Sequence, residues 1–483
     1  MKTRVVVLLG LLAASAASAA PGGFDRKAWR EDYATLKHEL ESSYSHLAWA
    51  ASPASGVDLP ALDRRTLHAL DAARSDADAS AALVGFVTSF HDGHFAPTVT
   101  PEASGASAEP PARAADTDVS SACAALGYSP ATRVAFSLPF ESLDGFRLQS
   151  DGISHAFRSG TIAVSGHRFG LVRIPRFRPA EYPALCLATW PAQDAIEAAW
   201  LRELAGRLAA LRAAEVEAVI VDVGGNGGGN DLGDWAARLF TSRDVHSAPL
   251  LMHAGPLGAK YMDEQLQGLN DALAAHGGDA KVEAVLRPAI EAFERRKHES
   301  LQHPCDLTWV WREQRRFDPA KCSGLVDAGF MNGAVDYLTP GSLPPDAAAA
   351  LYWATVADPM RGAWDGPVYL LTDAGTASAA EMFAALMRDR GIAKTVGVRT
   401  LGLGCGSMVE SAPFTLPHSR LSFRIPNCVR LRADGTDEVA GIVPDLPVLP
   451  VANESPRARA ARALAVMAQD VRRGAASAGA ERQ

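Results

Sequence analysis

Several signatures of common enzyme and binding classes are missing from this chain of 483 residues. No two cysteines have C-x-x-C spacing, no H-E-x-x-H occurs, and His91 and His94 lack an obvious third ligand, so a metal site is disfavoured. The glycine-rich segment 224–229 does not fit G-x-G-x-x-G, because a third glycine would have to replace Asn230, and no G-x-x-x-x-G-K-[ST] occurs. A net charge of −8 argues against nucleic-acid binding. The sequence predicts neither a cofactor nor a metal.

A membrane-spanning segment is also missing. Residues 1–19 contain a basic start, a compact apolar stretch and a small-residue cleavage signal, which together are typical of a secretory signal peptide. The apolar stretch is too short to span a bilayer comfortably, and no later segment offers about 20 apolar residues in a row. No cysteine follows the signal to carry a lipid. The sequence predicts a periplasmic or secreted protein without a stable membrane anchor.

Cysteine is scarce, but the six cysteines form an even set. In an exported chain such a set favours disulfides, with unpaired buried thiols as the alternative. The pairs expected from closeness in sequence are Cys123 with Cys186, Cys305 with Cys322, and Cys405 with Cys428.

Hydrophobic periodicity separates a helical N-terminal region from a region in which strands and helices alternate. Residues 25–90 carry three helical patterns, whereas residues 161–240 predict a hairpin, a helix, a buried strand and a further helix. This order implies a layered α/β core with parallel strand pairing. The expected division is 1–19 signal peptide, 20–95 N-terminal helical lobe, 96–158 variable linker or insertion, 159–253 first half of the core, 254–360 mostly helical insertion, 361–450 second half of the core, and 451–483 C-terminal helix and tail.

Ser378 has a setting typical of a nucleophile. Residues 368–373 predict a buried strand and the residues after Ser378 predict a helix, so the serine lies at a helix start. The unpaired N–H groups and the positive dipole end there could stabilise an attacking alkoxide and the oxyanion that it creates. The alternative is simple helix capping, because Glu381 completes an S-x-x-E box. No G-x-S-x-G surrounds the serine, which argues against an α/β-hydrolase elbow.

Four segments, in the same order, resemble those of the tail-specific (C-terminal processing) serine proteases. Residues 376–382 (TASAAEM) resemble the family's nucleophile block, and most closely that of the nisin-resistance-type branch. The family also has a segment with a histidine, which residues 91–94 (HDGH) resemble. Its glycine-rich segment is similar to residues 222–229 (DVGGNGGG), and its last segment is similar to residues 438–445 (EVAGIVPD). The resemblance implies a ClpP/crotonase-like core and a serine peptidase that cleaves peptides or proteins through an acyl-enzyme.

The resemblance also implies roles for single residues. Ser378 is the expected nucleophile, and the N–H groups of Gly228 and Ala379 are the expected oxyanion hole. The arginine that relatives have in the glycine motif is replaced here by Gly224. This replacement puts in doubt whatever that arginine does in relatives.

The general base departs from the commonest family pattern. Most members use a lysine about 25 residues after the serine, where this chain has Leu403. The branch similar to the tricorn core uses an N-terminal histidine instead, which here is His94; Lys394, the nearest lysine, lies outside the motif. A histidine with its ordinary pKa of about 6.5 is a suitable base. Glu438 is the family-matched candidate to orient His94, and Glu381 competes for a supporting role.

Two features leave alternatives open. The insertion at 254–360 precedes the nucleophile strand and is expected to border the cleft, either as a cap that selects substrates or as a stabilising addition. The segment up to residue 158 lacks the carboxylate-binding loop of the peptide-binding module that many relatives have, so that module is expected to be missing or replaced. A non-catalytic peptide or small-molecule binding protein on the same fold, or a serine esterase, remains an alternative function.

Overall fold

The computed structural model describes residues 23–98, 134–182, 184–186, 195–302, 305–333, 342–351 and 356–480. The predicted signal peptide at 1–19 and the central part of the predicted linker, residues 99–133, lie outside the described residues. Among the residues that the structure describes, no helix combines the length and apolar character needed to cross a membrane.

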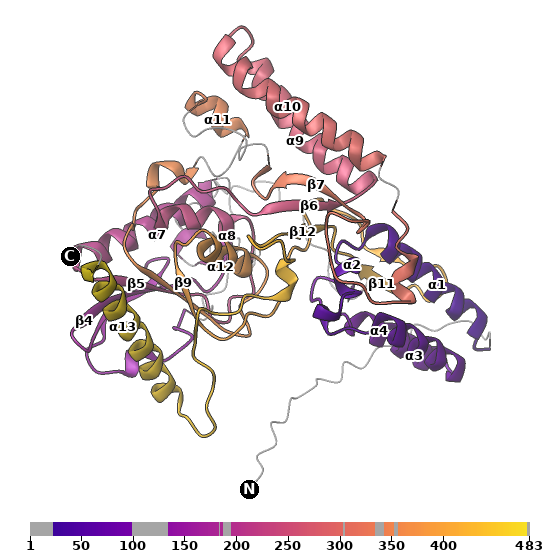
Figure 1. Ribbon diagram of the computed structural model, residues 1–483, viewed down its shortest axis with the longest axis horizontal. Coiled ribbons are helices and arrows are strands. Elements are labelled where there is room, and N and C mark those ends of the chain that lie inside the picture. Colours follow the sequence, from indigo (N-terminus) through magenta and orange to yellow (C-terminus); the bar gives the residue numbers. More distant parts are fainter. Residues whose placement is uncertain are drawn as a thin grey trace, which may run out of the picture.

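The N-terminal lobe is helical, as its periodicity predicts. Its helices are α1 (Arg26–Ser43), α2 (Leu47–Ala50), α3 (Leu59–Ala72) and α4 (Asp76–Thr88). Side chains of Asp25, Asp58 and Ser75 accept N–H groups at the starts of α1, α3 and α4, which fixes where these helices begin. Figure 1 shows these indigo helices grouped together on the right of the molecule.

A mixed sheet of seven strands forms the centre of the larger body, in the order β13-β9-β8-β5-β4-β3-β2. Its strands are β2 (Arg147–Asp151), β3 (Arg158–Val164), β4 (His167–Arg173), β5 (Ala218–Asp222), β8 (Val368–Thr372), β9 (Lys394–Gly397) and β13 (Leu446–Pro447). Pairing is parallel from β4 to β13, whereas β2 and β3 are antiparallel. The expected α/β class is therefore confirmed at this level.

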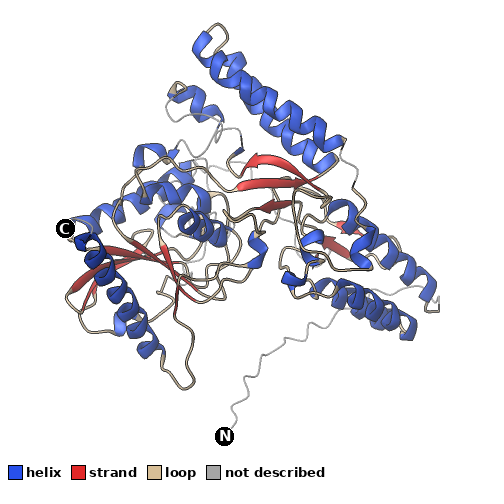
Figure 2. Cartoon of the chain, in the orientation of Figure 1, coloured by secondary structure: helices blue, strands red, loops and turns tan. Residues whose placement is uncertain are grey.

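Helices cover both faces of this sheet. One face carries α7 (Ile196–Ala213), α8 (Leu232–Trp235) and α12 (Ala379–Asp389), and the other carries α13 (Pro456–Ala480). Side chains along strand β5 point alternately to the two faces of the sheet. Val219 and Val221 pack with α7 and α12, whereas Ile220 packs with α13. Figure 2 shows the sheet between these helices.

Two further sheets have three strands each, and Phe423 of the first packs in the hydrophobic core of the N-terminal lobe. One contains β1 (Ala96–Thr98), β11 (Ser422–Arg424) and β10 (Phe414–Thr415); the other contains β12 (Cys428–Arg430), β6 (Pro249–His253) and β7 (Leu325–Phe330). The sequence places residues 96–98 in a linker, but they pair with β11. A strand of three residues is too short to show a period-2 pattern, so this strand was not predictable from hydrophobic periodicity.

The expected disulfides are present wherever both cysteines are described. Cys305 is bonded to Cys322, and Cys405 to Cys428. Cys186 is also disulfide-bonded, and its expected partner Cys123 lies outside the described residues.

The insertion is mostly helical, with a hairpin of α9 (Pro256–Ala275) and α10 (Ala280–Leu301) followed by α11 (Pro345–Leu351). The short 3-10 helices among the described residues are η1 (Pro53–Ser55), η2 (Phe140–Ser142), η3 (Pro179–Glu181), η5 (Ala236–Phe240), η6 (Thr308–Trp311), η9 (Asp358–Met360) and η10 (Glu438–Ala440). The hairpin packs on β6 and β7 and extends away from the seven-stranded sheet (Figure 1). Trp309 and Trp311 of η6 instead complete the core of the N-terminal lobe.

Candidate active site

Ser378 lies on a strained turn between β8 and α12. Its φ of 54° and ψ of −120° are rare for a residue with a side chain and persist only where the surroundings enforce them. The turn is held against the glycine segment, because Thr376 Oγ1 donates to the Val223 carbonyl (3.0 Å) and the Ala377 N–H donates to the Asn226 carbonyl (2.9 Å). The chain thus builds a sharp strand-to-helix turn without a G-x-S-x-G sequence.

His94 reaches this serine from the loop that follows α4. Its Nε2 lies 3.2 Å from Ser378 Oγ, and its Nδ1 lies 3.1 Å from the Leu403 carbonyl. A carbonyl can only accept, so Nδ1 carries the proton and Nε2 accepts from the serine hydroxyl. Asp92 supports the same loop, since its Oδ1 accepts the His94 N–H (2.8 Å) and lies 3.8 Å from Nδ1.

The surroundings of His94 keep it neutral. Burial lowers the pKa of His94 below its ordinary value, and the nearby charges of Arg430 and His46 lower it further. The Asp92 carboxylate and the Leu403 carbonyl act in the opposite direction without cancelling the effect. A neutral imidazole with Nε2 directed at a hydroxyl is the form that can accept its proton.

Glu381 joins the nucleophile turn to the loop that orients His94. Its buried carboxylate accepts the Ser378 N–H (3.0 Å), the Thr400 hydroxyl (2.6 Å), and the N–H groups of Gly402 (2.6 Å) and Leu403 (2.9 Å). Burial, together with the Glu438 charge, raises the pKa of Glu381, and these hydrogen bonds oppose the rise. The S-x-x-E spacing in the sequence predicts that Glu381 caps the helix, but it does not predict the contacts of Glu381 with residues 400–403.

Glu438 lies near the site without touching His94. Its carboxylate accepts two hydrogen bonds from Arg430, at 2.8 Å from Nε and 2.7 Å from Nη2, in a buried pair. The same Arg430 Nη2 donates to the Gly404 carbonyl (2.8 Å) and to the Ser378 carbonyl (3.4 Å). Within the described part of the chain no hydrogen bond joins Glu438 to His94, and the contacts of Glu438 reach the Ser378 turn through Arg430.

The two expected oxyanion donors differ. The Ala379 N–H is the first amide of α12 and has no acceptor among the described residues. The Gly228 N–H donates to Asn226 Oδ1 at 2.8 Å and is therefore engaged. Gly228 itself abuts the nucleophile: a Cβ added there would lie 2.7 Å from the Ser378 Cβ and 2.9 Å from the Ala379 nitrogen.

Gly224, where the family resemblance leads us to expect an arginine, also has no room for a side chain. A Cβ added there would lie 2.5 Å from the Ser137 Cβ and 3.0 Å from Asp373 Oδ2. Ser137 fills this space because its N–H and hydroxyl both donate to the Asp222 carboxylate at 2.6 Å.

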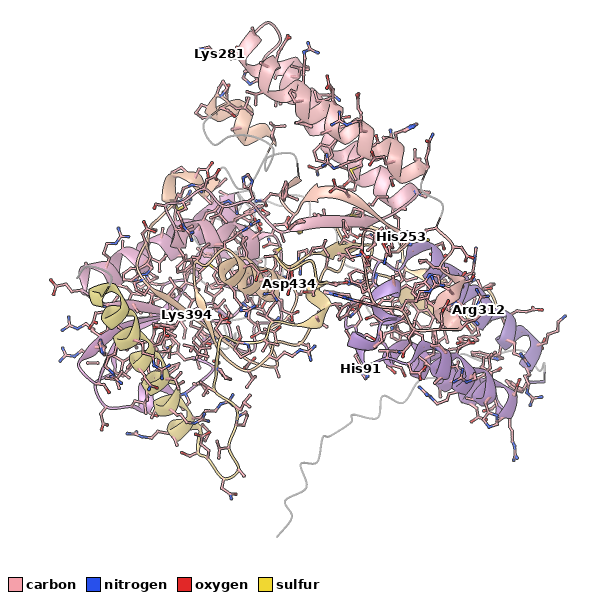
Figure 3. The ribbon with its side chains drawn as sticks, viewed as in Figure 1. His91, His253, Lys281, Arg312, Lys394 and Asp434 are labelled. Atoms are coloured by element: carbon pink, nitrogen blue, oxygen red, sulfur yellow. A yellow bond between two sulfur atoms is a disulfide. The ribbon has the colours of Figure 1, made fainter. Side chains whose placement is uncertain are left out.

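Lys394, the only lysine near the serine in sequence, is committed elsewhere. Its Nζ lies 2.8 and 2.7 Å from the two carboxylate oxygens of Asp470 on α13. Figure 3 shows Lys394 beside α13 and His91 at the edge of the helical lobe, well apart. Among the described residues, no group of three or more His, Cys, Asp or Glu side chains could hold a metal ion.

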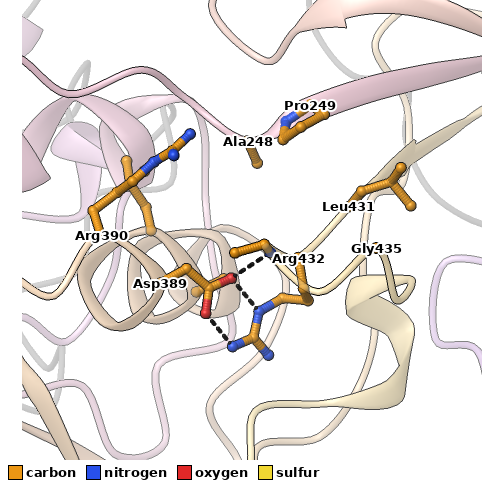
Figure 4. Close-up of a pocket in the computed structure, with 10 residues that line it drawn as sticks. Ala248, Pro249, Asp389, Arg390, Leu431, Arg432 and Gly435 are labelled. Carbon is orange, nitrogen blue, oxygen red and sulfur yellow. Dashed lines mark hydrogen bonds and ion pairs between the residues drawn. The ribbon is translucent and has the colours of Figure 1, made fainter.

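A pocket of about 340 Å³ lies at the other end of α12 and is distinct from the Ser378 site (Figure 4). Its charged walls are already paired, because Asp389 accepts two hydrogen bonds from Arg432, at 2.7 and 2.6 Å, and Arg390 donates to the carbonyls of His246 and Ser247. The pocket therefore offers no free charged group.

Serine hydrolases use a serine on a strained turn, a neutral histidine at its hydroxyl and a helix amide open to an oxyanion, and the described residues bring groups of these three kinds together here. Residues 313–448 match the family model described as Peptidase family S41, and this stretch includes Ser378 and Glu438. The chain is a serine-type peptidase. The match supports the tail-specific protease family to which the sequence segments pointed.

The solved structures of mature CPAF share the fold at low identity. Mature CPAF complexed with lactacystin is 15% identical, with a TM-score of 0.53 over 90% of this chain and 96% of that chain. Mature CPAF alone is 14% identical, with a TM-score of 0.51 over 90% and 95%. The photosystem II D1 C-terminal processing protease is 13% identical over 88% and 94%, with a TM-score of only 0.32. No curated protein sequence gives a significant match.

Proposed function

We propose that the protein is an exported serine peptidase in which Ser378 is the nucleophile and His94 is the general base. One observation carries the proposal: His94 Nε2 lies 3.2 Å from Ser378 Oγ although the two residues are 284 positions apart in the chain. A binding protein on this fold would have no need to bring this pair together. The missing lysine base is thereby replaced.

The geometry suggests the steps of the reaction. Ser378 Oγ attacks the scissile carbonyl carbon while His94 Nε2 takes the hydroxyl proton, and Nδ1 keeps its bond to the Leu403 carbonyl. The carbonyl oxygen becomes an oxyanion, and the Ala379 N–H donates a hydrogen bond to it. His94 then returns the proton to the leaving amine, and water hydrolyses the acyl-enzyme by the same path.

The Gly228 N–H is the proposed second oxyanion donor. It has to leave Asn226 Oδ1 before it can serve, so we propose that substrate binding turns the glycine segment. Positive φ values at Gly225 (65°), Gly228 (99°) and Gly229 (158°) show a backbone in which glycine is favoured over residues with side chains.

We propose supporting roles for both glutamates. Glu381 positions residues 400–403 and so the acceptor of His94 Nδ1. Glu438 holds Arg430, whose guanidinium fixes the carbonyls of Gly404 and Ser378. This differs from direct orientation of His94 by Glu438, and it makes Glu438 a positioning residue.

Export, a ClpP/crotonase-like core and membership of the nisin-resistance-type branch complete the proposal. The disulfides and the signal-like start of the sequence support export to an oxidising compartment. The substrate is proposed to be a peptide or protein, and the cap role of residues 254–360 remains a prediction.

The test uses a library of internally quenched peptides and a fluorophosphonate probe, with which an activated serine forms a P–O bond as fluoride leaves. Ser378→Ala should abolish cleavage and labelling. Ser75→Ala is the matched control, since it removes a helix-capping hydroxyl at a cost of about 1 kcal/mol, at the end of α4 opposite to the His94 loop. Full activity of folded Ser378→Ala would reject the nucleophile, and cleavage of matched esters without any peptide cleavage would favour an esterase.

A further inference from the structure

The segment that follows β4 lies directly against the glycine segment beside Ser378. The Phe177 N–H donates to the Gly228 carbonyl (3.1 Å), and the Asn230 N–H donates to the Phe177 carbonyl (2.8 Å). Phe177 and Gly229 form a parallel β-bridge, and a Cβ on Gly229 would collide with the Phe177 carbonyl. Residues 176–178 therefore run as a neighbouring strand of the loop that flanks the nucleophile.

Alternation along this short strand separates its side chains. Phe177 is fully buried, with its ring 5.3 Å from that of Phe383 and 5.8 Å from that of Trp200. Neighbouring side chains on an extended strand point to opposite faces. Arg176 and Arg178 accordingly face outward, with side chains 41% and 63% exposed.

The Arg176 guanidinium contacts the glycine segment itself. A Cβ added at Gly227 would collide with Arg176 Nη1, so the missing side chain leaves room for the guanidinium to lie against the backbone. One residue further on, Gly228 abuts Ser378. This continuous set of contacts places the cation at the rim of the reactive serine.

The two arginines are only partly neutralised. Arg176 Nε and Arg178 Nη1 share the single carboxylate of Glu181, at 3.6 and 3.7 Å, and such long, exposed pairs are weak. The next acidic group along the loop, Asp231, interacts instead with Asp234 and Arg430. Arg176 and Arg178 form what we call the arginine shelf, which carries excess positive charge beside the nucleophile.

We propose that the arginine shelf binds a carboxylate of the substrate close to the scissile bond. A guanidinium offers paired donors that fit a carboxylate, so the shelf selects acidic substrates over neutral ones. The carboxylate can come from an Asp or Glu side chain or from a free chain end. This inference rests on the proposed function, because the shelf gains its role from its closeness to Ser378.

Matched peptides test the shelf. The peptide library is first searched for a peptide that the protein cleaves. Variants of this peptide then carry either Glu or Gln at each position around the scissile bond. Each variant is made with a free and with an amidated C-terminus. The double variant Arg176→Gln/Arg178→Gln should raise KM for the preferred acidic peptide about tenfold or more, with kcat and the neutral peptides little changed. Loss of a Glu-over-Gln preference identifies a side chain, and loss of an acid-over-amide preference identifies a chain end.

Two variants sharpen this result. Arg287→Gln, on α10, removes an arginine that is 60% exposed and paired with a glutamate, and it should leave the preference unchanged. Arg176→Glu should favour a Lys peptide over its Glu counterpart. An unchanged acidic-to-neutral ratio in the double variant overturns the shelf while Ser378-dependent cleavage continues. If no peptide is cleaved in a Ser378-dependent way, the proposed function fails instead. The arginine shelf is then tested by calorimetry, which measures whether the Ser378→Ala variant binds the acidic peptides more tightly than the neutral ones.

Discussion

The two side chains of the proposed catalytic pair are held by different parts of the molecule. Ser378 is fixed locally, by a buried strand, a turn and a helix that are continuous in sequence. His94 comes from the helical lobe, and its Nδ1 partner is a carbonyl 309 positions away, at Leu403. The proposed nucleophile therefore depends on one supersecondary unit, whereas the proposed base depends on docking of the lobe against the core.

The docking contacts are buried and polar. Ser45 donates through its N–H to the Pro426 carbonyl (3.1 Å) and through its hydroxyl to the Cys428 carbonyl (2.8 Å). Asp32 accepts the N–H groups of His418 (3.0 Å) and Ser419 (2.7 Å). Perturbations near Ser378 should act on the chemistry itself, and perturbations near His94 should act through the position and protonation of the base.

After loss of Ser378 itself, removing the proposed base should have the largest effect. We expect His94→Ala to lower kcat on the order of 10³-fold, because a positioned base contributes roughly 10² to 10⁴. The thermal transition should barely move, since the ring is partly exposed and only two hydrogen bonds are lost. The measurement is peptide cleavage by each variant, alongside a melting curve.

Two matched variants complete the experiment. His91→Ala alters an exposed histidine three residues away and should keep full activity. Lys394→Ala should lose only its surface pair with Asp470. An active His94→Ala together with an inactive Lys394→Ala would restore a serine–lysine mechanism.

The same contrast explains what the sequence could predict. The strand, the turn and the helix around Ser378 were predictable, because local periodicity determines them. His94 was identified only through family resemblance. The Leu403 carbonyl was not predictable, because any residue offers a carbonyl, and the bonds of Glu381 depend on how residues 400–403 fold back. Contacts made by backbone atoms across long sequence separations leave no pattern in the side chains.

Replacing glycine by alanine near Ser378 and near His94 should give the next largest effects on kcat, with the larger loss near Ser378. Gly228→Ala meets the Ser378 Cβ and backbone of the nucleophile turn, at a φ of 99°, and should lower kcat about 100-fold. Gly406→Ala meets the His94 ring, with a Cβ 2.8 Å from Cδ2, and the ring can rotate, so we expect only about a tenfold loss. Gly206→Ala, with open space around it, serves as the control in both kcat and melting temperature. A larger loss at position 406 than at 228 would reverse the comparison.

Glu381→Gln should affect both sides moderately. The amide keeps one acceptor oxygen, but its NH₂ group faces an N–H donor, which should cost about 1–3 kcal/mol of stability and about tenfold in kcat. In the intact protein, kcat/KM should rise with pH through a midpoint below the ordinary histidine pKa of about 6.5. Since the Leu403 carbonyl raises the pKa of His94, loosening that carbonyl should move the midpoint lower still. An unmoved midpoint would assign Glu381 to stability alone.

His46 should give the smallest change in rate and a clear change in stability. This fully buried histidine lies 2.6 Å from Asp437 Oδ2 and 3.0 Å from the Cys405 carbonyl, where the lobe meets the core. Burial alone would lower the pKa of His46, but the charges of Asp437 and Asp92 and the Cys405 carbonyl outweigh it and raise the pKa to about 9. The folded protein therefore holds a proton there that the unfolded chain releases above about pH 6.5.

The sign of the pH effect follows from this difference. The stabilisation is fully present below about pH 6.5 and is lost as the pH rises through about 9, so unfolding free energy should fall by a few kcal/mol over that window. His46→Gln removes the titration and should flatten this slope, whereas His68→Gln, on the exposed face of α3, should not. Because the His46 charge also lowers the pKa of His94, the midpoint of kcat/KM should shift upward in His46→Gln with only a few-fold change in the plateau. Equal slopes in all three proteins would show that the lobe is not held to the core by a protonated His46, and that the base is less dependent on this contact than the geometry implies.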